Sequence, residues 1–304
     1  MCSKPRRPTT GKRITDRDER RYSFWASHHR LTALAFGYSL LIASGASVGA
    51  QEIVKPEARA STDEYTVKLS ALPEYSEGKY GTGHTTQILD VPFRGDWSAT
   101  DRLELSLTIP YVWMRGRGDI TIVGGRAVAR RRGGARRPGQ VTTADGLGDI
   151  LAEVDYTLLE EKDLVPDLTP FVEIKFPTAD ASHGLGTGEF DEKIGGFVTK
   201  KVAERWTTHV DLSYTFVGSP PRTSLRNFFE WSVGVSYDVT NSLKLSGYLD
   251  GATAVSRGQQ DPLDLRLVGE YKLTKVIQLT AGASAGLSHA SPDFAVLAGI
   301  ELRF

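Results

Sequence analysis

An all-β fold is predicted by this sequence: an antiparallel, up-and-down transmembrane β-barrel of about 12 strands, preceded by an N-terminal signal peptide. Three observations predict it. Apolar and polar residues alternate with a period of two along most of residues 63–304. The connections between these segments alternate between short and longer ones along the chain. The last segment keeps its alternation up to the terminal residue, Phe304.

The overall composition agrees with a barrel and disagrees with a helical membrane protein. The chain has 304 residues, of which 40% are hydrophobic, and its mean hydropathy is −0.26. A barrel hides its membrane face in the alternation, so its composition resembles that of a water-soluble protein. The single cysteine, Cys2, excludes an internal disulfide, and no Cys/His spacing indicates a zinc site. We therefore expect no cofactor.

The N-terminal 50 residues read as a signal peptide with an extended basic region. This region precedes an apolar run from Leu31 to Ser44, and Val48-Gly49-Ala50 supplies small residues for cleavage after Ala50. The alternative is a retained membrane helix, but the run is shorter than the ~20 residues that a span needs. Residues 51–62 are polar, and we expect them to form a flexible periplasmic N-terminus.

Removal of residues 1–50 makes the protein acidic. These residues hold nine of the 37 basic and three of the 37 acidic side chains, which leaves 28 basic and 34 acidic residues. A net charge of −6 gives no support to nucleic-acid binding, which requires a basic surface.

Each predicted strand places apolar residues at every second position. The strands are expected at 64–71, 84–97, 102–113, 148–159, 168–177, 191–202, 209–216, 229–238, 243–250, 263–272, 277–287 and 294–304. The clearest internal example sets Leu103, Leu105 and Leu107 against more polar neighbours over about 11 residues, the length that a tilted strand needs to cross a bilayer. Tyr111 and Trp113 lie near its end, where an interfacial aromatic band is expected. A soluble sandwich is the alternative for such half-apolar strands.

The longest connection, 115–145, is predicted to be a basic extracellular loop. Residues 119–129 contain Gly124-Gly125 and are expected to form a hairpin rising from the barrel. The loop also carries an arginine cluster: Arg126, Arg130, Arg131, Arg132, Arg136 and Arg137. Either these arginines are simply solvated, or they contact lipopolysaccharide phosphates or recruit an anionic solute.

The polar face of the strands is predicted to line the lumen. A charged residue facing lipid near the bilayer centre costs about 2–4 kcal/mol, so many charges in the strands require a wet or mutually paired interior. The candidate lumen and selectivity residues are Arg94, Arg102, Glu104, Glu153, Asp155, Glu173, Lys175, Asp211, Glu230, Arg266 and Glu270. A purely structural polar network is the alternative.

Three stretches resemble a family of bacterial outer-membrane barrels, the transporters also described as MetA-pathway-like proteins of phenol degradation. The stretches are Asp101–Leu105 leading to Ile109-Pro110-Tyr111, Gly146–Ile150, and Lys175–Asp180 continuing into Gly184–Gly188. The resemblance implies a Gram-negative outer-membrane channel that passes small, aromatic or hydrophobic solutes passively through a polar lumen. The alternatives are a barrel hydrolase, for which His209 and Asp211 are the residues to check, and a non-conducting structural or adhesive barrel.

The C-terminal strand resembles the assembly signal of such barrels. Ile300, Leu302 and Phe304 are apolar in alternation and end in an aromatic residue. The resemblance implies that the barrel-assembly machinery reads these residues. It also implies contact with outer-membrane lipid and lipopolysaccharide, and a small-molecule solute as the remaining partner.

Overall fold

The computed structural model describes residues 66–129, 141–220 and 225–304. The predicted signal peptide, the predicted periplasmic N-terminus and residues 63–65 lie outside these ranges. Within them, no helix is long and apolar enough to cross a membrane.

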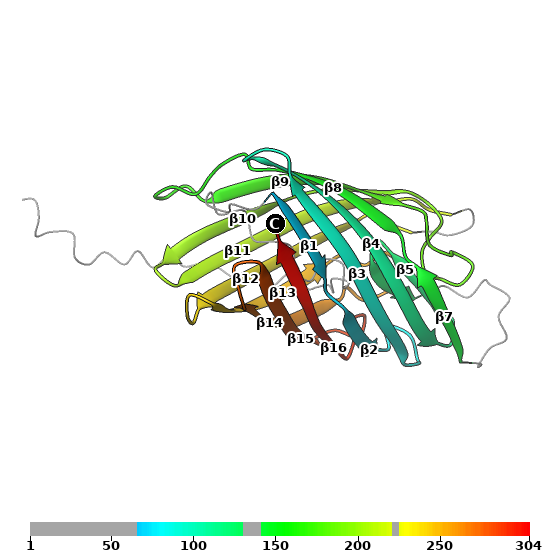
Figure 1. The fold of residues 1–304 in the computed structure, drawn as a ribbon. Coiled ribbons are helices and arrows are strands. Elements are labelled where there is room, and N and C mark those ends of the chain that lie inside the picture. Colours follow the sequence, from blue (N-terminus) through cyan, green and yellow to red (C-terminus); the bar gives the residue numbers. More distant parts are fainter. Residues whose placement is uncertain (1–65, 130–140, 221–224) are drawn as a thin grey trace, which may run out of the picture. The chain divides into compact units, whose positions relative to one another are not determined.

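Fourteen strands form one sheet that closes on itself, and two more form a separate hairpin. The strands are β1 (Val67–Ala71), β2 (Glu74–Gly78), β3 (Thr86–Ser98), β4 (Leu103–Gly116), β5 (Ile120–Val123), β6 (Arg126–Ala129), β7 (Thr142–Leu147), β8 (Ile150–Tyr156), β9 (Asp167–Phe176), β10 (Asp191–Ala203), β11 (Trp206–Val217), β12 (Phe228–Asp238), β13 (Leu243–Ala252), β14 (Leu263–Lys272), β15 (Ile277–Gly286) and β16 (Phe294–Arg303). From β8 to β16, each strand pairs antiparallel with its neighbour in sequence (Figure 1).

The closed wall has twelve strand positions, as predicted. β1 and β2 lie end to end between β3 and β16, and β7 and β8 lie end to end along β4. The first pair is interrupted at Leu72-Pro73, where proline has no N–H for the ladder. The second is interrupted at Gly148-Asp149, between two stretches that both pair with β4. An even number of antiparallel strands closes the barrel without a free edge.

Two strand segments lie where loops are predicted. β2 falls in the stretch 73–83, and β7 begins within the predicted loop 115–145 and ends just after it. Neither segment shows a long apolar alternation, because β2 carries Glu74 and Glu77 and β7 carries Asp145 and Gly146. Pairing with β3, β4 and β16 holds these segments in the wall, so tertiary context overrides the weak local pattern.

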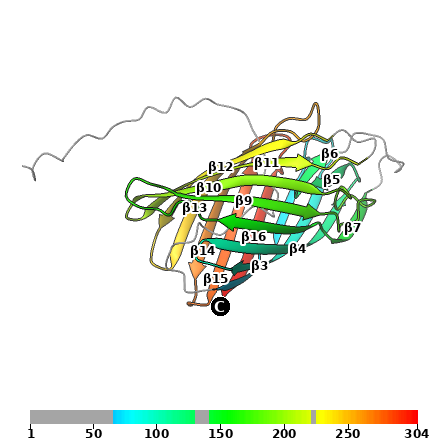
Figure 2. The same ribbon diagram turned by 90° about the horizontal axis from the view of Figure 1, so that it is seen from above.

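The outer face of the wall is apolar and the inner face is largely polar. On β4, Leu107 is 48% exposed on the outside, whereas Ser106 is 6% exposed on the inside. The same alternation holds along the other long strands; Figure 2 shows β9, β10, β11 and β12 running side by side. An exposed apolar face is stable only against lipid, because in water it would form a large aggregation-prone surface.

Aromatic side chains on the outer face gather toward both strand ends. One band lies near the short connections and includes Trp97, Tyr156, Trp206, Tyr237 and Tyr271. The other lies toward the longer connections and includes Tyr111, Phe176, Phe190, Phe216, Phe229 and Phe294. Two such bands mark the two membrane–water interfaces of a transmembrane barrel.

The connections define two different ends of the barrel. Residues 99–102, 204–205, 239–242 and 273–276 are short turns at the end that also holds Thr66 and Phe304. Residues 79–85, 117–119, 177–190, 253–262 and 287–293 belong to longer connections at the other end. In outer-membrane barrels the short turns are periplasmic and the longer loops extracellular.

Phe304 lies at the seam where the first and last strands meet. Its carbonyl oxygen accepts hydrogen bonds from the backbone N–H groups of Thr66 (2.8 Å) and Val67 (3.1 Å), and its own N–H donates to the carbonyl of Val67 (2.9 Å). The ring is 59% exposed. The backbone of Phe304 therefore closes the barrel, while its side chain is available to another molecule.

Deletion of Phe304 is expected to reduce the yield of assembled barrel strongly. The deletion removes three seam hydrogen bonds and the ring that we propose the barrel-assembly machinery recognises. The measurement is the fraction of outer-membrane protein that migrates as a compact band in unheated gels and shifts on boiling.

Two substitutions separate the ring from the backbone. Phe304→Ala keeps the seam bonds and is expected to lower the yield, whereas Phe304→Tyr is expected to retain it. Phe294→Ala, on the same strand and also facing outward, is the matched control. Normal yield of the Phe304→Ala barrel would contradict recognition of the ring.

Candidate lumen site

Strand register places a row of inward-facing residues across six neighbouring strands. Each residue of the row lies directly opposite the next, from β9 to β14: Thr169, Phe197, Asp211, Ser232, Asp250 and Asp264. Adjacent rows follow the same geometry because side chains of one face repeat every second residue. The lumen wall is therefore a grid of side chains positioned by backbone pairing.

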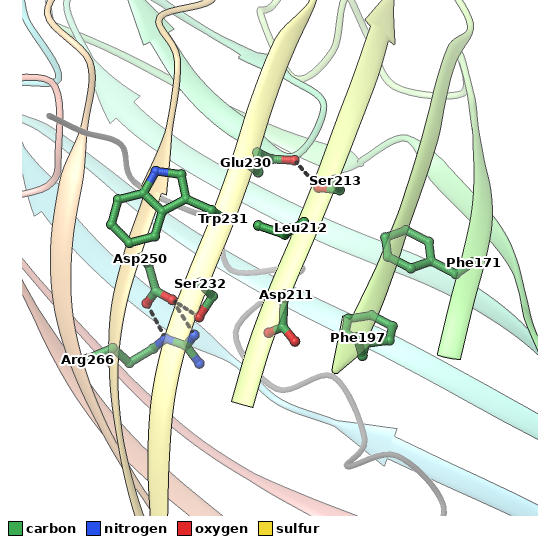
Figure 3. A pocket seen from close by; sticks show the side chains of 10 residues that line it. All are labelled: Phe171, Phe197, Asp211, Leu212, Ser213, Glu230, Trp231, Ser232, Asp250 and Arg266. Atoms are coloured by element: carbon green, nitrogen blue, oxygen red, sulfur yellow. Dashed lines mark hydrogen bonds and ion pairs between the residues drawn. The ribbon is translucent and has the colours of Figure 1, made fainter. Parts of the chain in front are cut away.

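Arg266, in the adjacent row, is held against Asp250 by a planar, two-pronged contact. Its Nε and one terminal nitrogen donate to the two carboxylate oxygens at 2.7 and 2.8 Å, and Ser232 donates to the same carboxylate at 2.6 Å (Figure 3). The guanidinium also lies over the ring of Tyr248, 4.4 Å from its centroid. Such bidentate and cation–π contacts fix the position of an arginine side chain.

Two phenylalanines form an aromatic platform on the inner wall beside this arginine. Phe171 on β9 and Phe197 on β10 stack with ring centroids 4.9 Å apart. Gly195 makes this possible, because a Cβ there would lie only 2.5 Å from the ring of Phe171. The platform, Asp211 and Arg266 line one hollow (Figure 3), which measures about 380 Å³ together with the open space that it joins.

Glu230 connects the wall strand β12 to Arg126 of the β5–β6 hairpin. Its carboxylate pairs with Arg126 at 3.0 Å and with Lys193 at 3.2 Å, and accepts a hydrogen bond from Ser213 at 3.3 Å. Lys193 also approaches Glu173 at 3.8 Å. Glu230 and Arg126 are both almost fully buried, so each of these charges requires a partner of opposite sign.

Two other buried bases are each held by two carboxylates. Lys175 contacts Asp149 (2.9 Å) and Asp191 (3.2 Å) near the extracellular end. Arg94 contacts Asp96 (2.6 Å) and Glu153 (2.9 Å) toward the periplasmic end, and it donates a further bond to Ser106 (2.8 Å). These groups tie neighbouring strands together inside the barrel.

The β5–β6 hairpin lies inside the extracellular end of the barrel. Gly124 and Gly125 make its two-residue turn, with φ values of 53° and 76°, which glycine adopts without strain. The N–H of Ile122 donates to the carbonyl of Gly184 in the β9–β10 loop at 3.0 Å. Gln259 of the β13–β14 loop donates to the carbonyl of Ala129 at 3.0 Å. Two other extracellular loops therefore hold the hairpin.

Apolar contacts anchor the hairpin on opposite walls. One cluster packs Ile120 against inner residues of β3, β4 and β7, among them Ile88, Val112, Met114 and Ala144. A second cluster packs Val123 and Val128 against Phe228, Ala252 and Val255 around β12 and β13. The hairpin thus spans the lumen between the β4 side and the β12 side, and narrows it.

The expected hairpin exists, but its predicted direction is wrong. It folds inward instead of rising from the barrel, because its apolar residues find buried partners on the wall and Arg126 finds Glu230. Arg126 is 4% exposed and belongs to the lumen, not to a solvated loop. The other five arginines of the predicted cluster lie outside the described residues.

The β9–β10 loop that supports the hairpin is ordered by Asp180. This carboxylate accepts hydrogen bonds from the hydroxyl (2.6 Å) and N–H (2.8 Å) of Ser182 and contacts His183 Nδ1 at 2.5 Å. These contacts, that from Ser182 first, hold the pKa of Asp180 well below its usual range. The carboxylate therefore stays ionised at neutral pH, and the turn that presents Gly184 to the hairpin is formed there.

The structure places ten of the predicted lumen residues on the inner face and one elsewhere. The inner ones are Arg94, Glu104, Glu153, Asp155, Glu173, Lys175, Asp211, Glu230, Arg266 and Glu270. Arg102 does not lie in the lumen. It precedes β4 in an exposed turn and pairs at 2.8 Å with Glu160 of the next periplasmic connection. Alternation predicts a face but not the depth along the strand.

Aromatic and apolar inward positions were missed by the sequence analysis. Phe171, Phe197 and Tyr248 face inward although the polar set was expected there. Some of these inward-facing apolar residues could be recognised from the sequence, because consecutive residues of the strand are apolar and not only every second one. Examples are the run Tyr111–Met114 and the pair Phe228-Phe229. Continuous apolar stretches indicate packing on both sides of a strand.

His209 forms a structural hydrogen bond on the inner face. Its Nε2 lies 2.7 Å from the hydroxyl of Ser236, which in turn contacts Ser246 at 2.8 Å. Ser236 is 1% exposed, so this hydroxyl is out of reach of a substrate. In the described ranges, no group of three or more metal-ligating side chains has the geometry of a metal site.

A closed twelve-position barrel with a lipid-compatible outer face, two aromatic bands and a charged interior is an outer-membrane β-barrel. The chain belongs to the family described as "Putative MetA-pathway of phenol degradation", whose model matches residues 72–304. This agrees with the resemblance seen in the sequence. No curated protein sequence matches the chain.

Solved structures share the architecture at low sequence identity. The COG4313 outer membrane channel from Pseudomonas putida F1 is 14% identical, with a TM-score of 0.59, over 83% of this chain and 100% of that one. The NanC porin is 10% identical over 78% of this chain and 100% of its own, with a TM-score of 0.52. The translocator domain of the autotransporter NalP from Neisseria meningitidis is 10% identical over 80% and 90%, also at 0.52. At these identities the likeness concerns the fold.

Proposed function

We propose that the protein is a passive outer-membrane channel for small aromatic or hydrophobic solutes. The observation that carries the proposal is the hollow on the inner wall, beneath a hairpin that narrows the extracellular end. The barrel supplies a route through the membrane, and the hairpin restricts its width. The charged grid keeps the route polar, so that a solute crosses without meeting lipid.

The solute class is proposed from the chemistry of the hollow. The stacked rings of Phe171 and Phe197 offer an apolar face, and Ser213, Asp211 and Arg266 line the same space with polar groups. A small ring carrying a hydroxyl matches this combination, because the ring stacks while the hydroxyl hydrogen-bonds. The family description, which names phenol degradation, supports the same solute class.

Purified protein in planar bilayers is expected to conduct ions, and 4-hydroxybenzyl alcohol is expected to interrupt the current transiently. Phe197→Ala removes half of the platform and should shorten or abolish the interruptions. Phe216→Ala, an aromatic on the outer face, is the matched control and should leave them unchanged. Glycerol serves as the solute without a ring.

The outcomes separate two parts of the proposal. Absence of conductance, together with absence of solute uptake into liposomes, would remove the channel. Conductance with equal interruption by both solutes would remove the aromatic preference only. The hydrolase alternative draws no support from His209, because its serine partner is buried.

A further inference from the structure

The described interior of the barrel holds more acid than base. Twelve carboxylate side chains are buried there: Glu74, Asp90, Asp96, Asp149, Glu153, Asp155, Asp167, Glu173, Asp191, Glu230, Asp250 and Asp264. Five basic side chains are buried with them: Lys68, Arg126, Lys175, Lys193 and Arg266. Arg94, with a side chain 13% exposed, adds a sixth. Acidic side chains therefore outnumber basic ones in this part of the barrel.

The ion pairs preserve this excess instead of cancelling it. Arg94 and Lys175 each bring one positive charge to two carboxylates, so that one negative charge remains at each of these groups. Two other groups have equal numbers of positive and negative charges. One joins Arg126 and Lys193 to Glu230 and Glu173, and the other joins Arg266 to Asp250. The net negative charge therefore remains even when every ion pair within the described residues is formed.

Three of the acidic residues outside these ion pairs lie near one another inside the barrel. Glu74 on β2 is directly opposite Asp90 on β3, and both face inward. Asp264 on β14 lies within electrostatic reach of Glu74. Among the described residues, no basic side chain comes within ion-pair distance of any of the three, and neither carboxylate oxygen of Asp264 has a hydrogen-bond partner.

We propose that the lumen is cation-selective, passing small cations and uncharged solutes in preference to anions. This proposal rests on the proposed channel function. A carboxylate in a confined, weakly hydrated space takes up a positive partner, and where the described residues provide none, a proton or a mobile cation does so and an anion does not. A lining of one sign raises the local concentration of its counter-ion and repels ions of like charge.

The test is the reversal potential of the full-length protein in a planar bilayer separating unequal KCl solutions. We expect the sign of a cation-selective pore and a permeability about tenfold higher for K⁺ than for Cl⁻, at the low end of what a charged lining produces. Anion preference, or equal permeability, would overturn the cation selectivity and leave the channel standing. No current under any condition, with no solute uptake, would remove both.

A variant with three uncharged replacements tests whether these acidic residues cause the preference for cations. Glu74→Gln, Asp90→Asn and Asp264→Asn together are expected to lower the permeability ratio severalfold. Glu77→Gln is the matched control, because Glu77 lies on the same strand but contacts Tyr75 and Gln87 on the outer side. An unchanged ratio in the triple variant would overturn the assignment to these three residues. If that variant does not assemble, Asp264→Asn alone replaces it, judged by the same ratio.

Discussion

Replacing residues 119–129 by a short Gly-Ser linker is expected to raise single-channel conductance severalfold. The hairpin fills the space between the β4 and β12 walls, and both of its faces pack against inward-facing residues. Its removal leaves a wider route through the same closed wall, since β5 and β6 pair only with each other in the sheet ladder. The barrel itself should still assemble.

Arg126→Ala tests the narrowing of the lumen by the hairpin with a smaller change. It removes the 3.0 Å ion pair with Glu230 and leaves a buried carboxylate whose other partner is Lys193. We expect more frequent open events than in the wild type. Arg126→Lys retains the charge and is the matched control. If conductance is unchanged in both the linker variant and Arg126→Ala, the hairpin does not limit the flow.

Much of the wall could be predicted from the sequence because side-chain alternation is a local property. On β4, for example, Ser106 and Leu107 follow one another, and their opposite exposures are what alternation predicts. The number of wall positions and the two types of connection followed from the same reasoning. The sequence alone therefore predicts that residues such as Arg94, Glu153 and Lys175 face the lumen.

The position of the hairpin could not be predicted from local sequence patterns. Gly124-Gly125 predicts a tight turn, but nothing local says whether the turn points toward water or into the lumen. The direction depends on Phe228, Glu230 and Gln259, which lie about a hundred or more residues further along the chain. Arg102 shows the same limit, because its depth along the barrel depends on where the neighbouring turns lie.

Arg94→Ala is expected to reduce the free energy of unfolding by about 3–5 kcal/mol, the usual cost of removing one partner from a buried ion pair. The substitution leaves Asp96 and Glu153 inside the barrel without their shared base, and it removes the bond to Ser106. Denaturant-induced unfolding in detergent micelles or bilayers, followed by tryptophan fluorescence, measures the change.

Arg102→Ala is the matched control for this prediction. Its pair with Glu160 is half exposed on both sides, and water screens such contacts, so the unfolding curve should scarcely move. Adding Asp96→Asn and Glu153→Gln to Arg94→Ala is expected to restore much of the lost stability, because the uncompensated charges disappear with the base. Equal loss from the two arginine substitutions would contradict this electrostatic account of Arg94. Failure of the added substitutions to recover stability would point instead to lost packing around the guanidinium.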